Sequence, residues 1–355
     1  MEIQTCNKKV YLEKLDELTA YFESVSNTPM SMYFKVINLI SLNMRYEKIA
    51  FNKNLPQNPY LLVRNLIEEQ LQAFKSFADI LFIENPENKD IKTIMQYMED
   101  KHKNLWNALW NKYDEKAYEE KVDRYKYRIK INHLLELIED KSCLDLGCGH
   151  GTFSIALAEM GAKSADGIDF GEKSVEFANS VRKNRKSCDK VKFSVASIYK
   201  IPYQDDSFDF VIQNGVFHHM EDEAKAIDEA KRVLKKGGYF WYYTDGEGGI
   251  SYDLWDRSVY LLRNVPIEFI QKITKIMNIS TNKCYHLGDG LKATYRHTSW
   301  EKMTNLLKSK GFGNFKRLKG GFYTDLDGDT FESDSYAKEK FGEGDLRILA
   351  QLIEK

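Results

Sequence analysis

The sequence predicts an α/β fold, with a mostly parallel sheet sandwiched by helices and an all-helical region before it. From residue 142 onward, strand-like runs alternate with helical runs of about 10 to 18 residues, an order typical of a parallel sheet. Before that point, apolar residues recur at helical spacing. The 355 residues are 43% hydrophobic, which suffices for a substantial core and suggests about two domains.

Residues 1–112 are predicted to form a helical cap or assembly region. Leu12 and Leu15 lie near helical spacing. Asn58 followed by Pro59 is typical of a helix start, because asparagine caps free amides and proline fits the first turn. We expect this region to offer the surface for a homodimer.

Five later runs have strand character. They cover residues 142–147, 164–170, 191–197, 208–215 and 239–245. The helical runs between them cover residues 152–161, 172–183 and 221–238. Because the crossovers between parallel strands are right-handed, we expect a ligand crevice at the carboxyl ends of these strands.

The first of these strands ends in a glycine-rich turn, in the stretch CLDLGCGHGTF. Asp145, Gly147, Gly149 and Gly151 stand there as D-x-G-x-G-x-G. Glycine adopts positive φ at little cost, and a side chain at any of the three positions would obstruct a ligand lying against the turn. The next helix is predicted to begin near Thr152 and to aim its free amides at the crevice.

A turn of this kind serves two classes of ligand. A dinucleotide fingerprint would place its third glycine at position 152, which is threonine here. An acid also fits poorly beside a pyrophosphate, because like charges repel. Asp145 suits a cationic ligand instead, such as the sulfonium and ammonium groups of S-adenosylmethionine.

The stretch resembles motif I of the class I S-adenosylmethionine-dependent methyltransferases. GIDF, ending the second strand, and IPYQDDSFDFVIQNGVFHHM, around the fourth, also resemble that family, as does RVLKKGGYFWYY. The resemblance covers residues 115–245 well and residues 298–355 loosely. It implies a Rossmann-like seven-stranded sheet, whose cofactor-binding core spans residues 113–245 and whose C-terminal part spans residues 299–355.

The resemblance also implies the cofactor, S-adenosyl-L-methionine, and the residues that contact it. Those residues are Asp145, Gly147, Cys148, Gly149, Gly151, Asp169, Phe170, Ser197, Ile198 and Gln213. In the family, an acid at the position of Asp169 accepts both ribose hydroxyls, which suits a carboxylate because it has two acceptor oxygens. Phe170, Ser197 and Ile198 would bracket adenine, with serine where the family often has aspartate. The carbonyl of Gln213 would meet the methionine amine.

The remaining candidates concern the acceptor. His218 and His219 follow the fourth strand and are predicted to take a proton, with His219 preferred because it lies nearer the crevice rim. Tyr243, Asp245 and Glu247 follow the fifth strand and are predicted to contact the substrate.

Residues 246–298 interrupt the alternating pattern and are predicted to form a helical lid over the acceptor. No metal is expected. The five cysteines form no C-x-x-C pair, and in the run DLDGD the glycine falls at the wrong position for a calcium loop.

These features predict methyl transfer to N or O of a small molecule. The net charge of −1 and the absence of an N/D-P-P-Y/F motif disfavour a nucleic-acid partner. No stretch of about 18 apolar residues predicts a membrane span, and the cysteines suit a reduced cytoplasm. An RNA or protein methyltransferase and a non-catalytic S-adenosylmethionine-binding scaffold stay open as alternatives.

Overall fold

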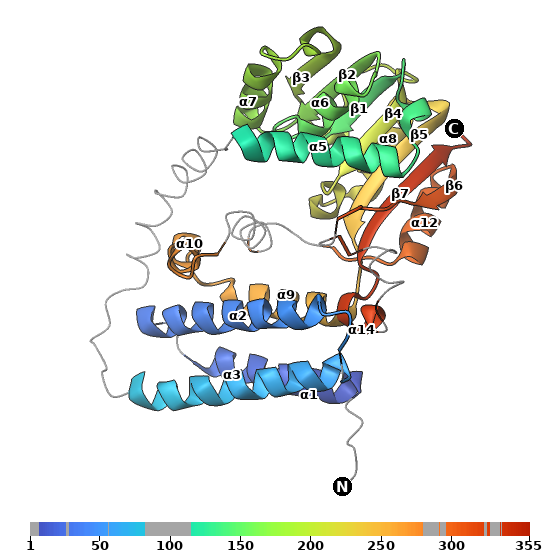
Figure 1. Cartoon of the computed structure of the whole chain (residues 1–355). Coiled ribbons are helices and arrows are strands. Elements are labelled where there is room, and N and C mark those ends of the chain that lie inside the picture. The colour runs from blue at the N-terminus through green and yellow to red at the C-terminus, as the bar shows by residue number, and fades with distance from the viewer. Residues whose placement is uncertain are drawn as a thin grey trace. The chain divides into compact units, whose positions relative to one another are not determined.

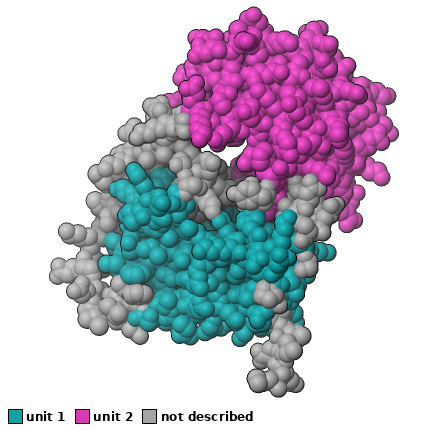
Figure 2. Space-filling model, in the orientation of Figure 1, with its two compact units in different colours: residues 1–112, 248–293, 333–342 teal, residues 113–247, 294–332, 343–355 magenta. Residues whose placement is uncertain are grey.

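The chain forms two compact units. The structure is a computed structural model that describes residues 7–25, 28–55, 57–81, 115–279, 291, 296–322, 325–326, 334 and 336–355. The helical unit comprises residues 1–112, 248–293 and 333–342, and the sheet unit comprises residues 113–247, 294–332 and 343–355 (Figure 2).

The sheet unit is built on seven strands, which confirms the predicted sheet. They are β1 (Ser142–Leu146), β2 (Ser164–Asp169), β3 (Val191–Val195), β4 (Phe208–Asn214), β5 (Leu234–Asp245), β6 (Phe312–Arg317) and β7 (Asp345–Leu352). Their order is β3-β2-β1-β4-β5-β7-β6. The first five strands pair in parallel, while β7 is antiparallel to both β5 and β6.

The strand order reverses between β1 and β4. Leu146 of β1 pairs with Ile168 of β2 on one side and with Gln213 of β4 on the other. In an open parallel sheet, the loops that leave such a reversal point diverge and form a ligand crevice. The register therefore places the glycine turn and the loop after β4 side by side.

Helices cover both faces of the sheet (Figure 1). One face packs against α5 (Glu115–Ile131), α6 (Thr152–Glu159) and α7 (Glu172–Arg182), and the other packs against α8 (Glu223–Val233) and α12 (Trp300–Ser309). Along β4, Phe210 and Ile212 face the first group of helices and Val211 faces the second. This burial on both faces explains why the strands are continuously apolar.

Side chains from α7 cover the free edge of the sheet at β3. Asn179 donates its amide N–H to the carbonyl of Phe193 (3.2 Å), and Arg182 donates to the carbonyl of Val191 (2.7 Å). Capped carbonyls cannot pair with another strand, so the sheet ends here.

The helical unit combines segments that are distant in sequence. It contains α1 (Lys8–Ser24), α2 (Pro29–Ala50), α3 (Pro59–Leu81), α9 (Gly249–Leu262), α10 (Ile267–Ile276) and α14 (Ala337–Phe341). The predicted N-terminal helices are thus present, although residues 82–112 lie outside the described part. Of the predicted lid, α9 packs with α1 and α2, and α10 packs with α2; its role as a lid stays a prediction. No described helix is long and apolar enough to cross a membrane.

A fully buried ion pair holds α14 within the helical unit. The ammonium of Lys340 lies 2.6 Å from the carboxylate of Asp334, and their side chains are 0% and 1% exposed. Lys340 also donates to the carbonyl of Asn52 (2.8 Å), and its own carbonyl accepts from the hydroxyl of Tyr46 (2.9 Å). Because both charges are removed from water, each depends on the other.

Asp334→Ala should lower the free energy of unfolding by about 3–5 kcal/mol, because it leaves the Lys340 ammonium buried without its counter-ion. Urea denaturation measures this loss. As a matched control, Glu13→Ala removes the partner of Lys9 in an ion pair whose side chains are 64% and 82% exposed, and it should change stability by less than about 1 kcal/mol. Equal effects of the two substitutions would contradict the assigned importance of the buried pair.

Candidate functional site

The glycine turn after β1 forms the floor of the candidate site. Gly147, Gly149 and Gly151 all have positive φ, at +75°, +50° and +78°. The amide of Gly147 donates to the carbonyl of Ile168 (2.8 Å), so the turn is tied to β2. Gly151 is the N-cap residue of α6, as the predicted helix start requires.

The three glycines differ in what surrounds them. A Cβ at Gly147 would lie 2.6 Å from Val216, and a Cβ at Gly151 would lie 2.3 Å from the ring of Phe193. A Cβ at Gly149 would meet no atom within 4 Å. The expectation that every side chain here would obstruct a ligand is therefore refined. Protein packing already requires two of the glycines, and only Gly149 borders open space.

The carboxylate of Asp169, at the end of β2, joins two loops. One oxygen accepts from the amide of Gly149 (2.9 Å), and the other accepts from the amide of Gly171 (2.8 Å). Each carboxylate oxygen can accept a further hydrogen bond, so the half-buried group retains capacity for a ligand. The next residue, Phe170, is 86% exposed, which is unusual for so large an apolar side chain.

Asp145 is buried beneath the turn. The residue is 3% exposed, and its carboxylate accepts from the Ser154 hydroxyl (2.9 Å). Its observed partner thus belongs to the first turn of α6. Burial raises the pKa of Asp145 to about 7, and the negative charge of Asp169 acts in the same direction.

The end of β3 contributes Ser197 and Ile198. The hydroxyl of Ser197 accepts from the amide of Tyr199 (3.2 Å), so one of its acceptor positions is already used. Ile198 is buried in the core on the α8 side of the sheet. The backbone here is tied to β2, because Ala196 donates to the carbonyl of Asp169 (2.9 Å).

The fully buried side chain of Gln213 shapes the loop after β4. Its amide nitrogen donates to the carbonyl of Tyr243 (2.9 Å). Its amide oxygen accepts from the backbone amides of Val216 (3.1 Å) and Phe217 (3.3 Å). The side chain therefore fixes the loop, and the contact predicted for Gln213 is made by its backbone carbonyl.

The two candidate histidines differ in accessibility. His218 is 2% exposed, and its Nδ1 lies 3.3 Å from the hydroxyl of Thr244. His219 is partly exposed, and the two ring centroids are 4.1 Å apart. Of the pair, His219 is the one that an acceptor could reach.

The end of β5 carries a charged network that sequence reasoning found only in part. The hydroxyl of Tyr243 lies 3.1 Å from a carboxylate oxygen of Asp245 and 3.4 Å from one of Asp345. Asp345 and Arg347 belong to β7, where they pair with Asp245 and Tyr243, and the guanidinium of Arg347 lies 2.9 Å from Asp345. Burial raises the pKa of Asp345 above its usual value, although the positive charge of Arg347 acts in the opposite direction. The one sign of this network in the sequence is that charged residues occur within the otherwise apolar run DLRILAQL.

The third substrate candidate, Glu247, lies closer to the surface than the network. The ammonium of Lys302 lies 2.7 Å from its carboxylate, and both side chains are more than a third exposed. A group this exposed is well solvated, so the ion pair adds little to stability.

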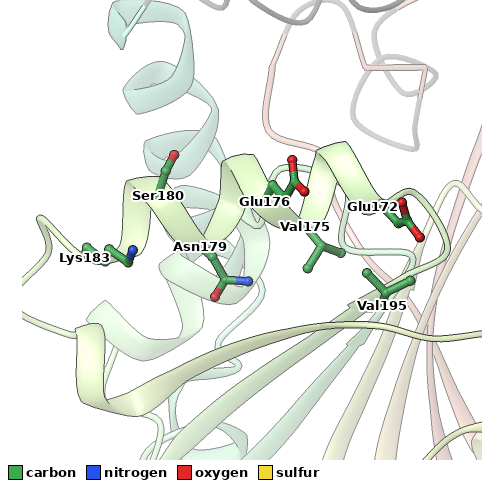
Figure 3. A pocket seen from close by; sticks show the side chains of 7 residues that line it. All are labelled: Glu172, Val175, Glu176, Asn179, Ser180, Lys183 and Val195. Atoms are coloured by element: carbon green, nitrogen blue, oxygen red, sulfur yellow. The ribbon is translucent and has the colours of Figure 1, made fainter.

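A separate groove of about 460 Å³ runs between α7 and the end of β3 (Figure 3). Its lining residues are Glu172, Val175, Glu176, Asn179, Ser180, Lys183 and Val195. None of the predicted site residues lines it. Among the described residues, no group of three or more histidine, cysteine, aspartate or glutamate side chains is arranged to hold a metal ion.

A family model described as a methyltransferase domain matches residues 138–311. The match supports the predicted resemblance to the class I S-adenosylmethionine-dependent methyltransferases. Proteins of that family use S-adenosylmethionine, so the match also supports the predicted cofactor. The match begins just before β1 of the methyltransferase sheet and ends at Gly311, just before β6.

Three curated methyltransferases are similar to part of this chain. The 27-O-demethylrifamycin SV methyltransferase of Amycolatopsis mediterranei is 37% identical over 136 residues, which are 38% of this chain and 48% of the relative. Sterol 4-C-methyltransferase strm-1 of Caenorhabditis elegans is 34% identical over 32% of this chain and 34% of its own length. Norajmaline N-methyltransferase of Rauvolfia serpentina is 32% identical over 27% of this chain and 33% of its own length. The chain thus spans less than half the length of each.

The raised pKa of Asp145 predicts a pH-dependent stability. The folded protein keeps a proton that the unfolded chain loses between about pH 4 and pH 7, so the contribution of Asp145 to stability falls as pH rises through this window. An asparagine at this position would carry no such proton. The free energy of unfolding of wild type, minus that of Asp145→Asn, should therefore fall by on the order of 2 kcal/mol from about pH 5 to pH 7 in urea denaturation. A constant difference would show that Asp145 ionises normally.

Proposed function

We propose that this protein transfers the methyl group of S-adenosylmethionine to N or O of a small molecule. The observation that carries the proposal is the arrangement of Asp169 and Gly149. The Asp169 carboxylate is held by two backbone amides, and the adjoining Gly149 borders open space. The first group offers hydrogen-bond acceptors to a ribose, and the second leaves room for it.

The proposed cofactor contacts follow the order of the strands. Asp169 would hold the ribose hydroxyls, and exposed Phe170 would cover the adenine with Ser197 and the backbone of Ile198. The carbonyl of Gln213 would accept from the methionine ammonium. Asp145 would act from beneath the turn, where it is buried, and not through a direct contact with the cofactor.

The acceptor is proposed to be a small molecule because the similar methyltransferases are named for small-molecule acceptors. Those names mention an O-demethylated rifamycin, a sterol and norajmaline, and they refer to O, C and N respectively. Nitrogen and oxygen are proposed because His219, the candidate proton acceptor, follows β4. Such an acceptor loses a proton when it is methylated.

The proposed mechanism rests mainly on alignment. S-adenosylmethionine supplies a methyl group on a positively charged sulfur, which is intrinsically electrophilic. The rigid turn and the β4 loop would hold the reacting atoms in line and exclude water. His219 would take the acceptor proton, with Thr244 fixing the neighbouring ring of His218. Tyr243, Asp245 and Glu247 would orient the acceptor.

A labelled-methyl assay tests the proposal directly. The protein is incubated with S-adenosylmethionine carrying a radioactive methyl group and with separate small-molecule, RNA and protein fractions. Label should appear in the small-molecule fraction. Label in RNA or protein alone would replace the acceptor class with that alternative. Binding of S-adenosylhomocysteine without transfer to any fraction would favour a non-catalytic scaffold.

The glycine turn provides a matched pair of variants. Gly149→Ala and Gly151→Ala both place a side chain at positive φ, which costs about 1 kcal/mol each. Only the second collides with Phe193, so it should lose about 1–3 kcal/mol more stability. Gly149→Ala should stay folded yet bind S-adenosylhomocysteine about 10-fold more weakly in calorimetry, because its methyl group occupies ligand space. Normal binding by a folded Gly149→Ala protein would place the cofactor elsewhere.

The histidine pair generates a kinetic prediction. His219→Ala should lower turnover at saturating substrate by about 10²–10⁴-fold while affinity for the cofactor stays unchanged, because a proton acceptor acts only on the chemical step. His218→Ala should have the smaller kinetic effect, since its ring is buried. If both variants keep full turnover from about pH 6 to pH 9, proton removal by these histidines is wrong.

A further inference from the structure

The side chain of Asn214, at the carboxyl end of β4, has a fixed orientation. The indole N–H of Trp241 lies 3.3 Å from the amide oxygen of Asn214. Because an indole nitrogen can only donate, this contact identifies the oxygen and the nitrogen of the amide. The amide nitrogen then faces Tyr125 of α5 and donates to its hydroxyl oxygen (3.2 Å).

The packing of the Tyr125 ring fixes the position of its hydroxyl. That ring stacks on Phe153 with centroids 4.2 Å apart and planes 6° from parallel, and Tyr125 is 6% exposed. Since the hydroxyl oxygen accepts from Asn214, its own hydrogen points to another group. Within the described part of the chain, no acceptor receives that hydrogen or the second amide hydrogen of Asn214. Two neighbouring donors are therefore available, which suits an oxygen acceptor such as a carboxylate.

The position of these two donors beside Gln213 indicates which group of the cofactor they would bind. Asn214 directly follows Gln213, whose carbonyl is proposed to hold the methionine ammonium of the cofactor. In an amino acid, the ammonium and the carboxylate are attached to the same carbon, so a group bound at residue 213 brings a carboxylate close to residue 214. Both donors lie beside the point where the strand order reverses.

We propose that Tyr125 and Asn214 bind the methionine carboxylate of S-adenosylmethionine. The assignment rests on the proposed function and adds two cofactor-binding residues to it. It makes α5 part of the cofactor site, because Tyr125 reaches the end of β4 from a helix that precedes β1. The two neutral donors would give the carboxylate two charge-assisted hydrogen bonds.

A pair of ligands isolates this contact. S-adenosylhomocysteine carries the amino-acid carboxylate, whereas 5′-methylthioadenosine keeps the adenine, the ribose and the sulfur but lacks it. Calorimetry should show that Tyr125→Phe weakens S-adenosylhomocysteine binding by about 10-fold or more and leaves 5′-methylthioadenosine binding unchanged. Asn214→Asp should weaken S-adenosylhomocysteine binding further, because the aspartate carboxylate would repel the ligand carboxylate. The aspartate could still accept from the indole N–H of Trp241.

The same helix offers a matched control. Tyr127→Phe makes the identical change two residues along α5, at a side chain that is 46% exposed, and it should alter neither affinity. Circular dichroism checks that each variant folds, and Tyr125→Phe alone carries the test if Asn214→Asp does not fold.

The outcomes separate this inference from the proposed function. If wild type binds S-adenosylhomocysteine but Tyr125→Phe weakens both ligands equally, or weakens neither, the carboxylate contact is wrong and the proposed function stands. If wild type binds no S-adenosylhomocysteine, the proposed function fails and this inference fails with it.

Discussion

The carboxylate of Asp169 is the group on which the rest of the candidate site depends. By accepting from the amides of Gly149 and Gly171, it ties the turn after β1 to the loop after β2. Hydrogen bonds to an ionised acceptor are stronger than those between neutral groups, so the open side of the turn is held rigidly. A ligand that meets this carboxylate therefore meets a preorganised surface and need not order the loop itself.

The sheet order supplies the opposite wall. Because β1 and β4 are neighbours, Val216 packs where a side chain at Gly147 would lie, and the side chain of Gln213 fixes the loop around it. Packing thus fixes one end of the glycine turn, while the region of Gly149 stays open. This contrast explains how a single turn can both stabilise the fold and leave room for a ligand.

The sequence predicts the parts of this site that are contiguous along the chain. The glycine turn directly follows β1 and Asp169 is the last residue of β2, so alternating runs and motif spacing suffice to place them. Tyr125 and Asp345 were missed because their partners, Asn214 and Tyr243, are 89 and 102 residues away. No local pattern encodes which residue of an antiparallel strand lies opposite another, or which side chain a preceding helix brings to a strand end. The motif also does not reveal how deeply each residue is buried: Asp145 lies beneath the turn and is only 3% exposed.

A crystal structure with S-adenosylhomocysteine tests the central claim most directly. The account predicts that both ribose hydroxyls lie within hydrogen-bond distance of the Asp169 carboxylate, with the homocysteine ammonium at the carbonyl of Gln213. A product bound elsewhere, for example in the groove along α7, would contradict the account. So would a product bound at this crevice with Asp169 in contact only with its two backbone amides.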